Sequence, residues 1–434
     1  MAESTRITPL EPDFPFQIIS HLVPVAPFRE YPHAIIDETK GVRLAVKQYI
    51  PRDVRPADRE DAITIIAAGG LGFIKELYEP LFEEIFRRCS RSGMKIRSIW
   101  IADMFNVGES AVANTDNLGC DPAWIDHAHD LWSVINFFKS EMAKPIIGLG
   151  HSYGCNQLLC LSSWHPSLFH SFAFIEPGID EQYGRGITIP WSLSVLRQRD
   201  RWLTKAEAEE GAVKGQHAET WDERVQARLK RYSVVKRTAA AGETWNLTTP
   251  KDQIASLVSR FNPEMLGLGP GGIEEMTLEQ RQRIPDIDPS ANNLGPFYRK
   301  ELRMAWRLLP GVRPWVLYIN GSNSPFFGHP ETREERARLT GIGVGGNGGM
   351  KLGAVKQIVI EKGRHTMPFD RNMNQVAEQV SDWLKTESGR WIEGAERHRE
   401  DWIKRSTEEK QTVGSEFIAA LAAEMKKMKR PGKM

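Results

Sequence analysis

The sequence lacks several features that would assign it to a specialised class of protein. Its 434 residues carry 57 Lys and Arg against 56 Asp and Glu, and a net charge of +1 gives no indication of a nucleic-acid partner. No apolar run approaches the ~18 residues that span a bilayer. The first residues contain acids and prolines where a signal peptide would have an apolar stretch. We therefore expect a cytoplasmic protein without a transmembrane segment.

Cysteine is also scarce, and its spacing indicates no metal site. The four cysteines show no C-x-x-C pattern, and no histidine pair has metal-ligand spacing. We expect reduced, mostly buried thiols at Cys89, Cys120, Cys155 and Cys160, and no bound metal.

A glycine-rich run at residues 341–349 is the one segment that looks like a nucleotide-binding loop. Dinucleotide binding requires such glycines between a strand and the helix whose N-terminus takes the pyrophosphate. Here the run leads toward a predicted strand at 354–360 instead. We interpret it as a connecting loop and expect no cofactor.

Strand-like and helix-like segments alternate along most of the chain. Short runs rich in apolar residues predict strands, with amphipathic helices between most of the later ones. The predicted strands are 17–25, 42–50, 61–67, 95–102, 146–149, 171–175, 313–320 and 354–360. Such alternation specifies a mostly parallel sheet with helices on both faces, so we predict the α/β class.

The alternation is interrupted once, over residues 181–309. We find several amphipathic stretches there and no convincing buried strand, which predicts a mostly helical cap inserted into the core. The chain is thereby divided into an irregular arm, a core in two parts, the cap and a charged helical tail, at 1–16, 17–180 and 310–390, 181–309 and 391–434.

The charged tail contains one apolar stripe. Its members are spaced at about one helical turn, at Phe417, Leu421, Met425 and Met428. Such a stripe predicts docking on the protein's own surface or on a second copy. A homodimer is therefore one expected assembly.

Residues 144–164 contain the motif with the most chemical content. A short apolar strand runs into Gly150-His151-Ser152-Tyr153-Gly154, and a helix follows at once. In a G-x-S-x-G elbow, small neighbours allow the sharp turn that raises the serine above the sheet. The helix directs its N–H groups and the positive end of its dipole at the reacting oxygen. Ser152 is the candidate nucleophile, and the amide of Tyr153 is a candidate oxyanion donor.

A serine hydroxyl needs a base, and the base needs an acid to orient it. In enzymes with this elbow the acid and then the histidine follow the serine in the chain. His365 lies a few residues past the last predicted strand and is the candidate base. The histidines that precede Ser152 are expected on a helix face or in the structure of the elbow, at His127, His129 and His151.

The acid is expected in an unusual place. Its ordinary position, the turn at 320–325, contains no carboxylate. Glu176 directly follows the strand next to the nucleophile strand, and it is the candidate acid. In the alternative, Glu176 caps the turn at Gly178, while Asp286 or Asp288 of the cap supplies the acid.

The second oxyanion donor is expected from the loop after the third core strand, at residues 69–73. The backbone amide of Leu71 or of Phe73 is the candidate. Because both donors are main-chain groups, the side chains at these positions need not be polar.

With these residues placed, the chain resembles the α/β-hydrolase superfamily. Within it, the chain is similar to the fungal group that includes peroxisomal lipase-like hydrolases and the hydrolases of toxin and polyketide gene clusters. The resemblance covers about residues 17–390 and rests on the segments 72–80, 101–103, 121–127, 150–154, 220–225 and 341–349. It implies an α/β-hydrolase fold with a helical cap, and Ser152 and His365 as nucleophile and base.

Two positions bear on how far the resemblance extends. The family is expected to carry a histidine and an asparagine in the loop that here reads Gly69-Gly70-Leu71, so a side chain that orders the oxyanion loop is missing. The C-terminal Gly432-Lys433-Met434 partly matches a peroxisomal address, which makes the peroxisome the second expected location.

The sequence therefore predicts a serine-dependent hydrolase. The resemblance implies that its partner is a hydrophobic small molecule with an ester, lactone or related acyl bond, such as a fungal polyketide. Two alternatives stay open. The same fold could perform C–C cleavage, transacylation or cyclisation, or the chain could be a ligand-binding homologue without turnover.

Overall fold

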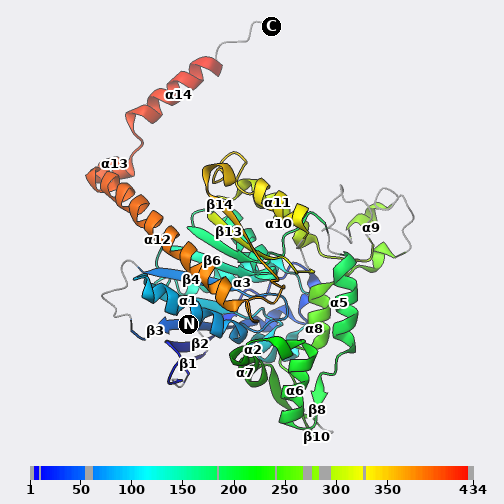
Figure 1. Ribbon diagram of the computed structural model, residues 1–434. Helices are drawn as coiled ribbons and strands as arrows, with labels where there is room; N and C mark the ends of the chain where they lie inside the picture. Colours follow the sequence, from blue (N-terminus) through cyan, green and yellow to red (C-terminus); the bar gives the residue numbers. More distant parts are fainter. Residues whose placement is uncertain are drawn as a thin grey trace. The chain divides into compact units, whose positions relative to one another are not determined.

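The computed structural model describes most of the chain, namely residues 4–8, 11–53, 62–182, 185–239, 242–266, 276–282, 295–325 and 329–428. The chain divides into two compact units, Met1–Lys385 and Thr386–Met434. Figure 1 labels the helices and strands along the chain.

A nine-stranded sheet forms the centre of the first unit, in the order β1-β2-β3-β5-β4-β6-β7-β13-β14 (Figure 1). From β5 to β14 the neighbouring strands run parallel, whereas β1, β2, β3 and β5 pair antiparallel. The strands are β1 (Ser4–Ile7), β2 (Phe16–Val25), β3 (Val42–Pro51), β4 (Ile63–Ala68), β5 (Ile96–Ala102), β6 (Ile146–His151), β7 (Ser171–Ile175), β13 (Trp315–Gly321) and β14 (Val355–Ile360). The predicted α/β class is confirmed, and every strand predicted for the core belongs to this sheet.

Alternating side chains of the strands supply two apolar layers, one on each face of the sheet. On β4, Ile63 and Ile65 belong to one buried cluster, and Ile66 belongs to the other. The first cluster includes side chains of α1 (Glu79–Arg91) and of the start of α12 (Met373–Lys404). The second includes side chains of α3 (Ile125–Phe137), α4 (Tyr153–Trp164) and α11 (Pro330–Leu339).

The prediction that residues 1–16 form an irregular arm is wrong in part. Strand β1 extends the sheet by pairing with β2, from Ser4 opposite Leu22 to Ile7 opposite Ile19. All four residues of β1 are exposed, so the sequence has no alternation of buried and exposed residues from which an edge strand could be predicted.

The segment between β7 and β13 lies outside the central sheet, and it contains strands as well as helices. A small antiparallel sheet in the order β8-β10-β9 accompanies its helices, and β11 pairs with β12. Its helices are α5 (Arg185–Arg197), α6 (Lys205–Gly215), α7 (Glu223–Tyr232), α8 (Lys251–Val258), α9 (Leu278–Gln282) and α10 (Lys300–Leu308), and its strands are β8 (Arg201–Trp202), β9 (Val234–Ala239), β10 (Gly242–Leu247), β11 (Arg260–Phe261) and β12 (Phe297–Tyr298). Strands β8, β11 and β12 have only two residues each, and β9 and β10 lack the buried apolar side chains from which a strand could be predicted.

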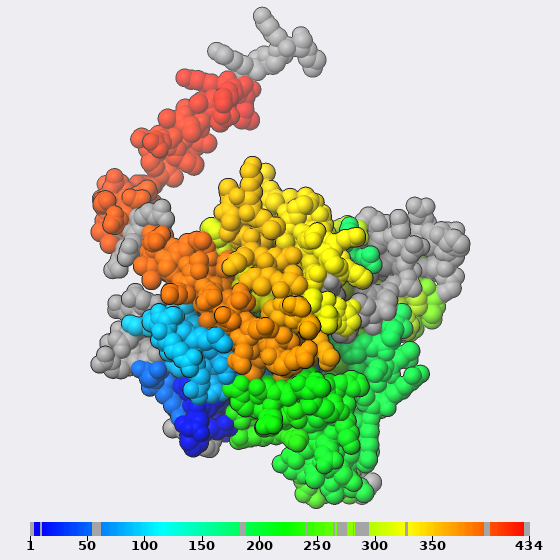
Figure 2. Space-filling view, in the orientation of Figure 1, coloured from blue at the N-terminus to red at the C-terminus, as the bar shows by residue number. Residues whose placement is uncertain are grey.

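Hydrogen bonds attach this inserted segment to the core. The amide of Asp222 donates to the carbonyl of Phe369 at 2.8 Å. The indole Nε1 of Trp124 donates to the carbonyl of Leu257 at 2.7 Å. Figure 2 shows the result on one face, where the green inserted segment lies directly against the orange part of the chain that follows β14.

The second unit contains the end of a long helix and two shorter ones. Helix α12 continues without a break through the predicted boundary at residue 390, and α13 (Thr407–Gln411) and α14 (Ser415–Met428) follow. The stripe predicted on the tail lies on α14, where Phe417, Leu421, Met425 and Met428 are 53% to 84% exposed. Residues 432–434, the candidate peroxisomal address, lie outside the described residues.

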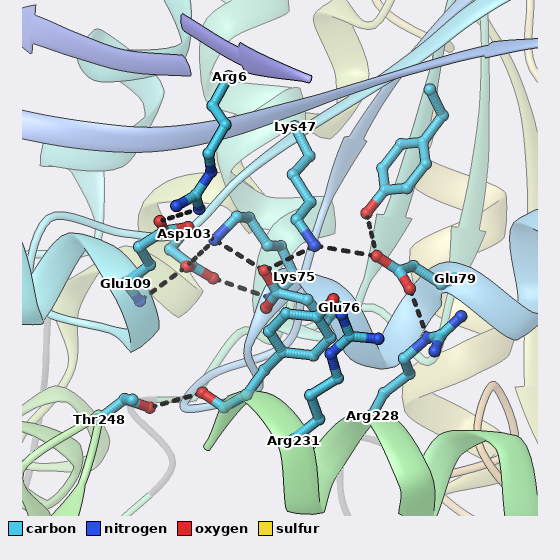
Figure 3. Close-up of polar contacts among 12 residues, drawn as sticks. Arg6, Lys47, Lys75, Glu76, Glu79, Asp103, Glu109, Arg228, Arg231 and Thr248 are labelled. Atoms are coloured by element: carbon cyan, nitrogen blue, oxygen red, sulfur yellow. Dashed lines mark hydrogen bonds and ion pairs between the residues drawn. The ribbon is translucent and has the colours of Figure 1, made fainter. Parts of the chain in front are cut away.

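A buried charge cluster, made of Lys47, Lys75, Glu76, Glu79 and Asp103, lies between β3, β5 and the segment before α1 (Figure 3). Nζ of Lys75 lies 2.7 Å from Oδ2 of Asp103 and 3.0 Å from Oε1 of Glu76. Nζ of Lys47 lies 3.1 Å from Glu76 and 3.0 Å from Glu79.

The inserted segment reaches this cluster through one arginine of α7. Nε of Arg228 lies 2.5 Å from Oε2 of Glu79, which Figure 3 also shows. The cluster therefore holds together two strands of the sheet, the start of α1 and the inserted segment.

The charges in the cluster depend on one another. Burial alone lowers the pKa of Lys75, but the carboxylates of Asp103, Glu76 and Glu109 outweigh it and hold that pKa well above its usual value. Lys75 is therefore a buried cation that compensates several carboxylates at once.

Replacing Lys75 with Met should lower the free energy of unfolding by about 3–5 kcal/mol, because it leaves buried carboxylates without their positive partner. Arg6→Met is the matched control. The Arg6 side chain is 76% exposed and lies 3.8 Å from Glu109 at the edge of the same cluster, so its loss should cost less than about 0.5 kcal/mol. Chemical denaturation measures both values, and equal losses would contradict this account of the cluster.

Candidate active site

The nucleophile elbow has the geometry that the motif predicts. Strand β6 ends at His151 and α4 begins at Tyr153, so Ser152 alone makes the turn, at φ 52° and ψ −115°. A Cβ atom on Gly154 would lie 2.0 Å from the carbonyl oxygen of Ala68, and one on Gly150 would lie 2.8 Å from Cα of Cys155. Any larger residue at either position would push the elbow away from its neighbours.

The structure brings Ser152, His365 and Glu176 together at the carboxyl ends of β6, β14 and β7. Nε2 of His365 lies 2.8 Å from Oγ of Ser152. Nδ1 of the same ring lies 3.2 Å from Oε2 of Glu176. All three residues are buried. With Nδ1–H donating to the carboxylate, Nε2 is left as the acceptor for the serine proton.

Glu176 is held in place by the strand that usually carries the acid. Its backbone has φ 50°, and its amide donates to the carbonyl of Ile319 at 2.8 Å. Its Oε1 accepts from the amide of Gly321, at the end of β13, at 2.5 Å. The turn at 320–325, which contains no carboxylate of its own, therefore supplies a backbone donor to Glu176 at the end of the neighbouring strand.

The rival carboxylates of the inserted segment, Asp286 and Asp288, lie outside the described residues.

The candidate oxyanion donors differ in what they already bind. Tyr153 is the first residue of α4, where the helix provides no acceptor for its amide. The amide of Phe73 donates to the carbonyl of Gly70 at 3.2 Å, which closes the turn. Of the two loop candidates, Leu71 is therefore the one whose amide is not used to close that turn.

The side chain of Phe73, rather than its amide, contacts the residues around Ser152. The ring stacks on His151, with 5.8 Å between centroids and 14° between planes. It also meets the ring of Trp221, from the inserted segment, at 5.9 Å. Phe369, in the loop after His365, lies 5.0 Å from Phe73 and 5.1 Å from Trp221. The inserted segment therefore contributes Trp221 to an aromatic wall, made of Phe73, Trp221 and Phe369, that packs on His151, the residue before Ser152.

Tyr78 was not predicted as a site residue, yet it contacts two parts of the site. Its hydroxyl oxygen accepts from the amide of Gly70 at 2.6 Å and lies 2.8 Å from Nδ1 of His151. The only sequence signal was its place in the segment 72–80 that carries the family resemblance. A buried tyrosine needs a partner for its hydroxyl, but the sequence does not name that partner.

Among the residues described, no group of three or more His, Cys, Asp or Glu side chains could hold a metal ion. Within the same part of the chain, no helix is long and apolar enough to cross a membrane.

The sheet order, the serine elbow after β6 and the histidine after β14 are those of the α/β-hydrolases, a class of hydrolytic enzymes. The solved structure of the peroxisomal α/β-hydrolase Lpx1 from Saccharomyces cerevisiae matches at a TM-score of 0.63 and 14% identity, over 90% of this chain and 99% of that chain. This likeness shows the fold.

Two proteins are similar to the chain over nearly their whole length. Type I acyl-CoA thioesterase mpaH from Penicillium roqueforti is 33% identical over 403 residues, which cover 87% of this chain and 89% of the relative. Type I acyl-CoA thioesterase mpaH' from Penicillium brevicompactum is 33% identical over 412 residues, which cover 89% and 91%. No protein-family model matches the sequence.

The chain belongs to the same family of α/β-hydrolases as these two Penicillium proteins, and it is an enzyme of the hydrolase class. The resemblance drawn from the sequence motifs is thereby confirmed.

His151 and His127 lead to a prediction about stability. Burial lowers the pKa of each to about 3, with His365 adding to the effect at His151 and Arg29 at His127. The unfolded chain regains a histidine pKa near 6.5, so it binds more protons than the folded chain below that pH. The free energy of unfolding should therefore fall as the pH drops from about 6.5 toward 3.

His151→Gln should flatten this dependence by about 2 kcal/mol at pH 5, since the glutamine cannot take up a proton on unfolding. His33→Gln, which replaces an exposed histidine, is the control and should leave the slope unchanged. Urea denaturation between pH 4.5 and 7.5 measures the slopes. Parallel curves for wild type and His151→Gln would show that His151 does not titrate in this way.

Proposed function

We propose that the chain is a serine-dependent hydrolase of acyl thioesters with an apolar acyl group. The observation that carries the proposal is the unbroken contact from Oγ of Ser152 through His365 to Glu176, at 2.8 and 3.2 Å. This order of groups turns a hydroxyl into a nucleophile near neutral pH.

In the proposed reaction, Oγ of Ser152 attacks the carbonyl carbon while Nε2 of His365 takes its proton. Glu176 stabilises the imidazolium that forms. The amides of Tyr153 and Leu71 hold the negative oxygen of the tetrahedral intermediate. The thiolate then leaves, taking a proton from His365, and an acyl-enzyme remains. Water activated by His365 attacks the acyl-enzyme, which releases the acid and restores Ser152.

One observation supports a thioester over other acyl bonds, and a second supports an apolar acyl group. The two Penicillium relatives are named acyl-CoA thioesterases. The aromatic wall formed by Phe73, Trp221 and Phe369 suits an apolar acyl chain rather than a polar one.

The inserted segment at 181–309 would then act as a cap on a core formed by 17–180 and 310–390. Its Trp221 lies in the aromatic wall, and the amide of Asp222 is bonded to the loop that follows His365. This arrangement supports a cap that shapes the acyl site.

Hydrolysis of decanoyl-CoA, decanoyl-N-acetylcysteamine and the matching oxygen ester tests the proposal. Wild type should cleave both thioesters, with kcat/KM for the N-acetylcysteamine thioester above that for its oxygen ester. Ser152→Ala and His365→Ala should each lose on the order of 10³-fold or more in kcat. Glu176→Gln should lose on the order of 10²–10⁴-fold, because an amide cannot stabilise the imidazolium.

Asp180→Asn is the matched carboxylate control. Asp180 follows the same strand, four positions after Glu176, and its side chain accepts from the amide of Gln182 rather than from His365. It should keep activity within about threefold of wild type. A Ser152→Ala variant with more than a tenth of wild-type activity would rule out the mechanism. Preference for the oxygen ester would leave the mechanism intact and move the substrate class to esters or lactones.

A further inference from the structure

We infer that Tyr78 and His151 are positioning residues that join the oxyanion loop to the loop of the base in one chain of hydrogen bonds. The inference rests on the proposed function, because it concerns how the same site is held in its reactive arrangement. The chain runs from the amide of Gly70 through Tyr78 and His151 to the carbonyl of His365.

Each step of this chain is short and buried. The amide of Gly70 donates to the hydroxyl of Tyr78 at 2.6 Å. That hydroxyl lies 2.8 Å from Nδ1 of His151. Nε2 of His151 lies 2.9 Å from the carbonyl oxygen of His365. Tyr78 and His151 are 3% and 1% exposed, so water does not compete for these groups.

The donors and acceptors of the chain have only one consistent direction. A carbonyl oxygen can only accept, so Nε2 of His151 must carry the hydrogen. A neutral imidazole then has Nδ1 as an acceptor, and the hydroxyl of Tyr78 must donate to it. The oxygen of that hydroxyl stays free to accept from Gly70. The direction fixes the tautomer of His151.

The two ionisable members keep this direction over a wide pH range. Burial holds the pKa of Tyr78 far above its usual value and that of His151 near 3. Neither group changes charge near neutral pH, so His151 is a fixed support and does not compete with His365 as a base.

The chain replaces the ordering side chain that the loop Gly69-Gly70-Leu71 lacks. The oxygen that orders the loop comes from Tyr78, later in the sequence but adjacent in the structure. Both glycines are packed against this arrangement. A Cβ on Gly69 would lie 3.0 Å from the ring of Tyr78, and one on Gly70 would lie 3.0 Å from Nδ1 of His151.

Tyr78 is itself anchored by the buried charge cluster. It ends the short helix η4 (Lys75–Tyr78), whose first two side chains are members of the cluster. The amide of Lys75 also donates to Oδ1 of Asp103 at 2.8 Å, and Glu79 follows Tyr78 directly. Figure 3 shows these side chains directed toward one another around η4. The cluster thus holds the backbone on both sides of Tyr78 in place.

The consequence for catalysis is geometric. At one end of the chain, Gly70 directly precedes Leu71, whose amide is the oxyanion donor. At the other end, the carbonyl that accepts from His151 belongs to His365, whose imidazole is the base. The hydrogen-bonded chain therefore sets the distance between an oxyanion donor and the base. This distance matters most when the tetrahedral intermediate forms, so its loss should lower kcat more than it changes KM.

Tyr78→Phe tests the inference, because it removes one hydroxyl and keeps the ring. With decanoyl-N-acetylcysteamine we expect kcat to fall by about 10- to 100-fold, with KM changed by less than about threefold. Tyr318→Phe is the matched control. Tyr318 is as buried, its hydroxyl is bonded to Oγ1 of Thr340 at 2.8 Å, and its loss should leave kcat within about twofold.

Two variants of His151 test whether this residue acts through its hydrogen bond to His365 or only through the packing of its ring. The Nε2 of a glutamine can still donate to the carbonyl of His365, so His151→Gln should keep more of kcat than His151→Leu. In the double variant Tyr78→Phe/His151→Leu the two losses should not multiply, because both break the same chain. Hydrogen exchange followed by mass spectrometry should show faster exchange in residues 69–73 and 363–367 of Tyr78→Phe, and not in Tyr318→Phe.

The outcomes separate this inference from the proposed function. If Ser152→Ala is inactive but Tyr78→Phe behaves like Tyr318→Phe in both kcat and exchange, the positioning role is wrong and the mechanism stands. If Tyr78→Phe changes KM alone, the inference is also wrong. If Ser152→Ala keeps wild-type activity, the proposed function fails and this inference fails with it.

Discussion

The turn at Ser152 is the constraint on which the rest of the site depends. The chain changes from a strand to a helix within one residue, and the backbone of Ser152 adopts φ 52° at this turn. Such a conformation costs free energy and persists only where the surroundings impose it. Here the neighbours of the turn impose it, since Gly154 packs against the carbonyl of Ala68 and the amide of Ser152 donates to Ile175 at 2.8 Å.

Strand β7, whose last residue accepts from the amide of Ser152, also carries Glu176 directly after its end. The carbonyl of Ser152 accepts from the amide of Gly178, two residues past Glu176, at 2.8 Å. The amide of Glu176 is bonded in turn to β13, so Ser152 and Glu176 share one network of backbone bonds. Because Glu176 lies at the end of the strand next to that of Ser152, the adjacent turn needs only a backbone donor, which Gly321 provides.

The core strands and the main candidate residues could be predicted from the sequence for a physical reason. Parallel strands present their carboxyl ends at one edge, so Ser152, Glu176 and His365 could be placed together once the strands were recognised. The choice between Leu71 and Phe73 could not be made, because it depends on a turn hydrogen bond that leaves no pattern in the sequence. Tyr78 was missed for a similar reason, since its partners are a backbone amide and a histidine far along the chain.

The fold was predicted less well where the strands have few or no buried residues. Strand β1 is exposed throughout, the described part of β9 has one buried residue, Val234, and β10 has none. Strands of this kind are stabilised by pairing with a neighbour rather than by their own apolar pattern. The small sheet of the inserted segment therefore could not be separated from the amphipathic helices around it.

The central claim is that Ser152 is the activated nucleophile, and covalent labelling tests it most directly. A fluorophosphonate reacts with an activated serine and leaves an adduct that mass spectrometry can assign to a residue. The account predicts one adduct per chain, in the peptide that contains Ser152, and no adduct in Ser152→Ala. An adduct on another residue, or none on the folded wild-type protein, would contradict it.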